Sequence, residues 1–236
     1  MNEAYKYPGN ELLLFEKAIN WKNYFSSHII PFIKGDVLEA GAGLGANTTL
    51  LNNNSPKSWT LLEPDESMTD SLKNKITANQ LPGNCNVITG TLDDLSHVQF
   101  DTIIYIDVLE HIEKDKEELL KAASLLRSGG HIIILSPAFQ FLFSPFDKEI
   151  GHYRRYSKQG LKKIIPSTLE ASRIRYLDSI GFFASLANRM LLRQSYPKLR
   201  QVYLWDRWMI PVSKIADKLF FHSFGKSILA ILKKDT

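Results

Sequence analysis

The chain has 236 residues, 44% of them hydrophobic and 23% charged, with a formal net charge of +4, which suits a globular protein with a sizeable core. One cysteine, Cys85, excludes an intramolecular disulfide, and no apolar run reaches the ~18 residues of a membrane span. The first residues also lack the basic region and apolar segment of a signal peptide, so we expect a cytoplasmic protein.

The first periodic segment covers residues 11–32, where apolar side chains recur at helical spacing up to Pro31. We expect one or two helices there. Residues 36–51 then read DVLEAGAGLGANTTLL, in which a short apolar strand is followed by glycines at positions 41, 43 and 45 and by a helical pattern. A strand that ends in a glycine-rich turn before a helix brings backbone N–H groups close to a ligand. The turn is therefore predicted to bind a cofactor.

Further strands and helices alternate along the chain. A second apolar strand, 59–62, ends at Glu63, an acid placed to accept hydrogen bonds from both hydroxyls of a ribose. A helix is expected over 64–78, and strands over 86–88 and 100–106.

A helix over 117–126 should stop at Ser128-Gly129-Gly130, before a fifth strand at 131–135. Repeated strand–helix units with apolar strands indicate a parallel sheet covered by helices on both faces. Ligands bind such sheets beyond the carboxyl ends of the strands.

The glycine turn resembles the first motif of the class I S-adenosylmethionine-dependent methyltransferases, acid-x-G-x-G-x-G, which residues 39–45 match throughout. The dinucleotide fingerprint G-x-G-x-x-G has a different spacing. The resemblance implies a seven-stranded, mostly parallel Rossmann-like sheet and S-adenosylmethionine as cofactor. It implies cofactor contacts from Glu39, Gly41, Ala42, Gly43, Gly45, Asn47, Thr48, Glu63, Pro64, Thr91, Leu92, Asp93, Ile106 and Asp107.

Two of these segments need comment. Thr91 stands where the family has an acid that binds the adenine amine, so Asp93 is the alternative, with the Leu92 backbone beside it. Residues 107–111 read D-V-L-E-H, which in the family lies beneath the methionine portion of the cofactor. His111 is either a base or substrate contact, or a residue that packs the loop. Helices before the first strand often cover the cofactor in this family, so Tyr5, Tyr7 and Trp21 either face the pocket or only pack.

Residues 138–156, AFQFLFSPFDKEIGHYRRY, are aromatic and polar at once. They resemble a subset of the family with a D-x-x-x-G-H-x-R-R-Y segment after the fifth strand, where acceptors dock. The resemblance implies acceptor contacts from Phe139, Arg154, Arg155 and Tyr156, and the arginines suit a carboxylate or phosphate. The alternative is a basic surface loop. The candidate bases are His111, His152 and Tyr153, which the sequence does not rank.

No metal site is predicted, because the histidines are scattered and no HxxxH or CxxC pairing occurs. A helix is expected over 157–165, and strands over 172–179 and 226–233. Residues 180–225 between the last two strands exceed the usual link of the family, so they should form two or three helices, one near 199–209, as a lid or a homodimer contact.

The domain expectation is one methyltransferase domain over 1–236, with a helical cap (1–34), a cofactor-binding core (35–136) and an acceptor-binding half (137–236). The expected activity is methyl transfer to a small-molecule, glycan-type or lipid-type acceptor at oxygen, nitrogen or carbon. The alternatives are a nicotinamide-dinucleotide oxidoreductase and a non-catalytic S-adenosylmethionine-binding protein. A nucleic-acid acceptor is not expected, because no N-P-P-Y-type tetrad follows the fourth strand and the basic charge is modest.

Overall fold

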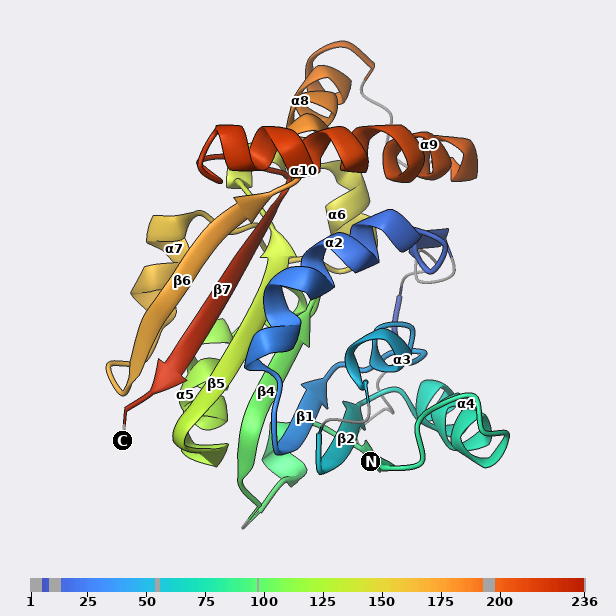
Figure 1. Cartoon of the computed structure of the whole chain (residues 1–236), viewed down its shortest axis with the longest axis vertical. Helices are drawn as coiled ribbons and strands as arrows, with labels where there is room; N and C mark the ends of the chain where they lie inside the picture. Colours follow the sequence, from blue (N-terminus) through green and yellow to red (C-terminus); the bar gives the residue numbers. More distant parts are fainter. Residues whose placement is uncertain (1–5, 9–13, 54–55, 97, 193–197, 236) are drawn as a thin grey trace.

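A seven-stranded sheet forms the centre of the computed structural model, which describes residues 6–8, 14–53, 56–96, 98–192 and 198–235 (Figure 1). The strand order is β3-β2-β1-β4-β5-β7-β6. Strands β1 to β5 run parallel, and β7 runs antiparallel to both of its neighbours. The predicted fold class is therefore confirmed. The strands are β1 (Asp36–Ala40), β2 (Ser58–Glu63), β3 (Cys85–Thr89), β4 (Phe100–Ile106), β5 (Leu126–Pro137), β6 (Leu169–Leu177) and β7 (Ser227–Lys234).

The central strands are buried on both faces, because successive side chains point to opposite sides of the sheet. In β5, Ile132 and Ile134 belong to one hydrophobic cluster, whereas Ile133 and Leu135 belong to another. Helices cover each cluster, as the apolar runs of these strands predict.

The helices that precede the last two strands match the predicted positions within a few residues. Asp65 begins the helix after β2, since its carboxylate accepts the N–H groups of Ser67 and Met68. The expected N-terminal helical region is also present, apart from residues 9–13, which lie outside the described residues. The α-helices are α2 (Ile19–Ile29), α3 (Thr48–Leu51), α4 (Glu66–Thr77), α5 (Asp115–Leu125), α6 (Pro145–Glu149) and α7 (Lys158–Ile164). The 3-10 helices are η1 (Ile30–Phe32), η2 (Leu92–Asp94), η3 (Leu109–His111) and η4 (Gln140–Leu142).

The sequence predicts that the helix stops at Ser128-Gly129-Gly130 and that the fifth strand begins after these glycines, and this boundary is wrong. Strand β5 begins at Leu126, directly after α5, and the register shifts between the pairs Phe100–Leu126 and Thr102–His131. The glycines therefore lie within a bulge of the strand. Gly129 has φ +72, a conformation that glycine adopts without steric cost.

The long link between β6 and β7 is helical, as predicted. It contains α8 (Ser179–Ala187), α9 (Leu199–Leu204) and α10 (Ile210–Leu219), with π-helical turns η5 (Asn188–Leu192) and η6 (Trp205–Met209). The expected helix near 199–209 continues to 219, because η6 joins α9 to α10 in one rod that lies across the end of the sheet (Figure 1).

Buried carboxylates fix this link to the rest of the chain. Asp217 accepts hydrogen bonds from the Tyr24 hydroxyl at 2.8 Å and from the N–H groups of Asp178 and Ser179 at 2.7 and 2.8 Å. The link is thereby held against α2 at the carboxyl edge of the parallel strands. None of the helices in the described ranges has the length and apolarity needed to cross a bilayer.

Candidate cofactor and acceptor site

A cavity of about 1590 Å³ lies beyond the carboxyl ends of the parallel strands. Its walls come from the glycine turn, the ends of β2 and β4, the segment after β5, α2 and the link between β6 and β7. The structure brings eleven of the predicted cofactor residues to this cavity: Gly41, Ala42, Gly43, Asn47, Glu63, Pro64, Thr91, Leu92, Asp93, Ile106 and Asp107.

The glycine turn allows backbone to approach closely at the cavity. Gly41 and Gly43 have φ +64 and +55, and a Cβ on Gly41 would lie 2.6 Å from a methyl carbon of Val108. Several N–H groups of the turn that the sequence predicts to face a ligand are instead paired within the chain. The N–H groups of Gly41 and Ala42 donate to the Leu62 carbonyl at 2.8 and 3.1 Å. At Gly41 and Gly43 the turn offers a ligand exposed backbone without a side chain.

Glu63 ties this turn to the end of β2. Its Oε2 accepts the Gly43 N–H at 2.8 Å and its Oε1 accepts the Asp65 N–H at 3.0 Å. Burial raises the pKa of Glu63, while the two backbone hydrogen bonds act in the opposite direction. Each carboxylate oxygen keeps a lone pair that could accept a ligand hydroxyl.

Three predicted cofactor residues lie behind the cavity wall. The Oε2 atom of Glu39 accepts hydrogen bonds from Thr48 Oγ1 and Trp59 Nε1, each at 2.8 Å. Burial raises the pKa of Glu39 to about 7. Gly45 packs against Leu72 instead of the cavity. Glu39, Gly45 and Thr48 therefore shape the turn from behind, which corrects their predicted contact role.

The predicted adenine segment forms a short capped turn at the cavity rim. Thr91 Oγ1 accepts the Asp93 N–H at 3.2 Å, and the Thr91 N–H donates to Asp94 at 2.8 Å. The Asp93 side chain points outward, 83% exposed, and forms an ion pair with Lys121. Its carboxylate is thus already engaged at the surface. Leu92 is buried and lines the cavity.

A polar cluster follows β4, at the centre of the cavity wall. Glu110 is fully buried, and neither of its carboxylate oxygens has a hydrogen-bond partner among the described residues. Burial and the nearby charge of Asp107 raise the pKa of Glu110 well above its usual range. The Ser136 hydroxyl has the opposite, smaller effect on that pKa, but it is not placed to donate a well-formed hydrogen bond.

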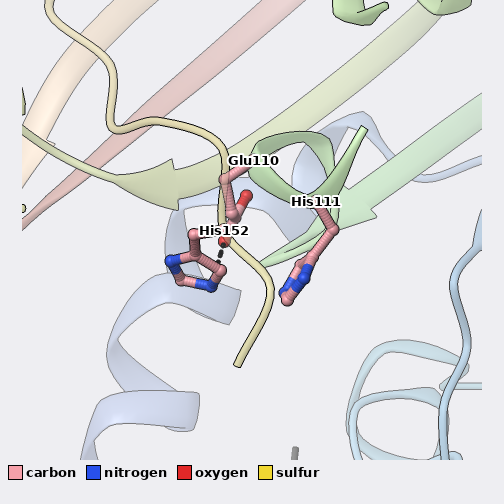
Figure 2. Close-up of side chains that lie close together, drawn as sticks. All are labelled: Glu110, His111 and His152. Atoms are coloured by element: carbon pink, nitrogen blue, oxygen red, sulfur yellow. Dashed lines mark ion pairs between the residues drawn. The ribbon is translucent and has the colours of Figure 1, made fainter. Parts of the chain in front are cut away.

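Two histidines complete this cluster (Figure 2). His152 Nε2 lies 3.8 Å from Glu110 Oε1, and the His152 ring stands edge-on to the His111 ring with centroids 4.5 Å apart. Burial, followed by the neighbouring His152, lowers the pKa of His111 to about 3. His111 and His152 come from segments far apart in the chain, so no residue spacing predicts the cluster.

Asp147 organises the segment after β5. Its carboxylate accepts two hydrogen bonds from Arg155, at 2.9 and 2.8 Å, and lies 3.0 Å from His152 Nδ1. Burial alone would raise the pKa of Asp147, but the hydrogen bonds from His152 and Arg155 outweigh it and hold the pKa low. Arg155 keeps one buried nitrogen, Nη1, without a partner, and its side chain lines the cavity.

The other residues predicted to contact the acceptor have structural partners instead. Arg154 pairs with Asp115 at 2.5 Å, and the Tyr156 hydroxyl donates to the same carboxylate at 2.8 Å. Phe139 stacks on a tyrosine ring in the core with centroids 4.5 Å apart. Tyr153 is 52% exposed at the surface. The cavity walls do not include Phe139, Tyr153, Arg154 or Tyr156, which corrects these four predictions.

The structure adds residues that sequence reasoning missed. Lys226, at the start of β7, lines the cavity with its ammonium 4.6 Å from the centre of the Trp205 ring. Burial, with a contribution from Arg155, lowers the pKa of Lys226, while Asp178 acts in the opposite direction. Of the N-terminal aromatics, Tyr7 and Trp21 line the cavity, and Tyr5 lies outside the described residues.

Comparison with known proteins indicates which kind of domain carries this cavity. A family model described as a methyltransferase domain matches residues 38–132, from β1 into β5. A curated relative, the ribosomal RNA small subunit methyltransferase C of Erwinia tasmaniensis, is 28% identical over 144 residues. That match covers 58% of this chain and 42% of the relative, so the chain spans about two fifths of the relative's length.

Solved structures share the fold. An S-adenosylmethionine-dependent methyltransferase from Clostridium acetobutylicum superposes with a TM-score of 0.61 at 12% identity, covering 96% of each chain. A methyltransferase solved with the Trm112 activator of Haloferax volcanii gives a TM-score of 0.63 at 13% identity, covering 96% of this chain and 92% of that one. Residues 38–132 are therefore similar to the methyltransferase domain family, and the seven-stranded sheet has the fold of solved S-adenosylmethionine-dependent methyltransferases.

Proposed function

We propose that the protein methylates a hydroxyl group on a small anionic molecule. The observation that carries this proposal is the Glu110–His111–His152 cluster on the cavity wall, directly after Asp107. A hydroxyl oxygen attacks the methyl carbon as the carbon–sulfur bond breaks, its electrons stay on sulfur, and the acceptor loses a proton. A cluster of histidine and carboxylate groups favours the loss of that proton. Carbon and nitrogen acceptors remain the alternatives.

The cofactor half of the cavity supports the positioning of S-adenosylmethionine. We assign the backbone of the glycine turn to close contact with the amino acid portion, and Glu63 to the ribose hydroxyls. The buried Leu92 and the rim at Thr91 are assigned to the adenine ring. When bound, the cofactor supplies an electrophilic methyl group, and the protein's task is to align the acceptor with it and to exclude water.

Two positively charged side chains of the cavity wall, Arg155 and Lys226, support the proposal that the acceptor is an anion. Arg155 is fixed by Asp147 through Nε and Nη2, so Nη1 is held in place without a partner. Lys226 lines the same cavity, and among the described residues its ammonium forms no ion pair. A carboxylate or phosphate on the acceptor would satisfy both groups in a place that is costly for unpaired charge.

A small acceptor is favoured over ribosomal RNA, although the curated relative bears a ribosomal RNA name. Tyr7, Trp21 and the link between β6 and β7 form part of the cavity wall, which suits an acceptor that enters the cavity. Base stacking on an open, basic face would suit RNA better.

The test is transfer of a labelled methyl group from S-adenosylmethionine to size-fractionated metabolites and, in parallel, to ribosomal RNA. We expect label in an anionic metabolite that mass spectrometry identifies. Lys226→Met should then raise the KM for that acceptor by about tenfold or more, the scale of a lost charge-assisted hydrogen bond, with cofactor affinity unchanged. Lys233→Met, on β7 itself and away from the cavity, is the matched control. Label confined to RNA would overturn the proposal.

A homodimer through the helical link also stays a proposal. The rod of α9, η6 and α10 exposes Trp208 (66%), Ile215 (72%) and Leu219 (70%), which lie close to helical spacing. Sedimentation velocity of the wild-type protein and of the Ile215→Asp variant measures the oligomeric state. A wild-type dimer that the substitution dissociates supports the proposal, and a wild-type monomer rejects it.

A further inference from the structure

We propose that Glu110, His111 and His152 hold a divalent transition-metal ion, and that the open positions of this ion bind the oxygen of the methyl acceptor. The second half of this statement rests on the proposed methylation of a hydroxyl group, whereas the first half concerns the chain's own residues. The structure gathers the three side chains at one point of the cavity wall, which the scattered histidines of the sequence do not suggest.

The geometry is close to that of a metal site. One ligand atom from each side chain lies within 4.8 Å of the other two, and His152 Nε2 is 3.8 Å from Glu110 Oε1 (Figure 2). Ligands on a common ion with bonds of about 2.0–2.2 Å stand roughly 3–3.5 Å apart. Side-chain movements on the order of 1 Å would therefore bring the three ligands into place.

Glu110 supplies an independent observation. Its carboxylate is fully buried, and both oxygens lack a hydrogen-bond partner among the described residues. A buried carboxylate without partners is costly, and proteins pair such groups with a cation or a donor. A metal ion between Glu110 and the two histidines would satisfy the carboxylate. The nearby Ser136 does not, because among the described residues its hydroxyl has no hydrogen-bond partner either.

The residue behind His152 fits the same role. Asp147 Oδ1 lies 3.0 Å from His152 Nδ1, so the ring donates from Nδ1 and keeps the lone pair of Nε2 for the cluster. Asp147 is itself fixed by Arg155 and by the Ser144 hydroxyl at 2.6 Å. A carboxylate that orients a ligating histidine from behind is a common feature of metal sites.

This ligand set indicates which ion and which chemistry. Two imidazoles and one carboxylate suit Mn²⁺, Fe²⁺ or Zn²⁺ better than Ca²⁺ and leave positions open for exogenous ligands. An acceptor hydroxyl bound at an open position becomes more acidic. It releases its proton to solvent, and its oxygen then forms the new bond to the methyl carbon while the carbon–sulfur bond breaks.

The experiment is a calorimetric titration of chelator-treated, tag-free full-length protein with Mn²⁺ and Zn²⁺, each alone. We expect one ion per chain. Glu110→Gln and, as a second variant, His111→Gln should each weaken binding by at least about tenfold, as loss of metal-site residues does. His131→Ala, on β5 and outside the cavity wall, should bind as the wild type does. Unchanged circular dichroism spectra show that each variant is folded.

The outcomes separate this proposal from the proposed function. No ion bound up to about 1 mM, or equal affinity in wild type and both variants, overturns the metal site. Methylation at full rate in the chelated protein overturns the role of the ion while hydroxyl methylation stands. An ion that binds as expected in a protein that methylates only carbon or RNA supports the site and rejects the proposed acceptor.

Discussion

The carboxylate of Asp206 accepts the backbone N–H of Trp21 at 2.8 Å across 185 positions of sequence. Its other oxygen accepts the Asn20 N–H at 3.1 Å. Helix α2 has no capping side chain of its own, since Ala18 stands at its N-cap. A residue of the link between β6 and β7 thus caps the helix that covers the cofactor end of the cavity.

This contact makes Asp206 a stability residue. Asp206→Ala should lower the free energy of unfolding by about 1–3 kcal/mol, because the buried N–H of Trp21 and the partly buried N–H of Asn20 lose their acceptor. Urea denaturation followed by circular dichroism measures the loss. Asp70→Ala, at an exposed helical ion pair with Lys73, is the control and should change stability little. Equal stability of the two variants would mean that the long-range cap contributes nothing.

The glycine turn should discriminate between cofactors. Thermal shift is expected to show stabilisation by S-adenosylmethionine, about 2.7 kcal/mol at a 100-fold excess over Kd, and none by nicotinamide dinucleotides. Gly41→Ala should abolish the stabilisation, since its Cβ would meet Val108 at 2.6 Å and strain a positive φ. Gly83→Ala, whose Cβ would meet no atom within 4 Å, is the control. Stabilisation by the dinucleotide alone would contradict the cofactor assignment.

Glu63 should bind the ribose as well as hold the turn. We expect Glu63→Ala to weaken S-adenosylmethionine binding by at least tenfold, because charge-assisted hydrogen bonds are worth about 1.5–3 kcal/mol each. Calorimetry gives the dissociation constants. Glu66→Ala, at the exposed start of α4, controls for charge. An unchanged constant would leave Glu63 with the turn contact alone.

Glu39 predicts a pH dependence of stability. Burial raises its pKa from 4.5 to about 7 in the folded chain, so the native state keeps a proton that the unfolded state loses. Stability should therefore fall as pH rises from about 4.5 to about 7, by roughly 3 kcal/mol for this group.

Removal of the titrating group tests this. Glu39→Gln should flatten that decline, because the amide oxygen can accept from Thr48 and Trp59 at every pH. Urea unfolding at pH 5 and pH 8 gives the two slopes, with the exposed Glu170→Gln as control. A decline of the same size in Glu39→Gln would show that another group causes it.

The sequence predicted the bounds of strands and helices well, because these depend on residues that are neighbours in the chain. Strand β4 has its predicted bounds, and Asp65 begins its helix where expected, because apolar runs and capping residues are local signals. The acceptor segment shows the limit. Arg154 and Arg155 look alike in sequence, yet Arg154 pairs with Asp115 away from the cavity and Arg155 pairs with Asp147 at the cavity wall.

What decided between them is contact between segments far apart in the chain. Lys226 could not be found for the same reason, since its place depends on the antiparallel direction of β7. The meeting of Glu110 with His152 likewise depends on β4 lying beside β5. The spacing of residues along the chain predicts neither the direction of β7 nor the pairing of β4 with β5.

The reversed direction of β7 has a consequence for how such a protein diversifies. Because β6 ends and β7 begins at the edge where the parallel strands end, an insertion between them lies beside the cavity, contributes part of its wall and leaves the strand register intact. The glycine turn follows β1, which stands three places from β7 and four places from β6 in the strand order. The length and composition of residues 180–225 can therefore vary without a change in strand register, and we expect such variation to reshape the cavity wall while Arg155 and Lys226, outside that range, keep their places.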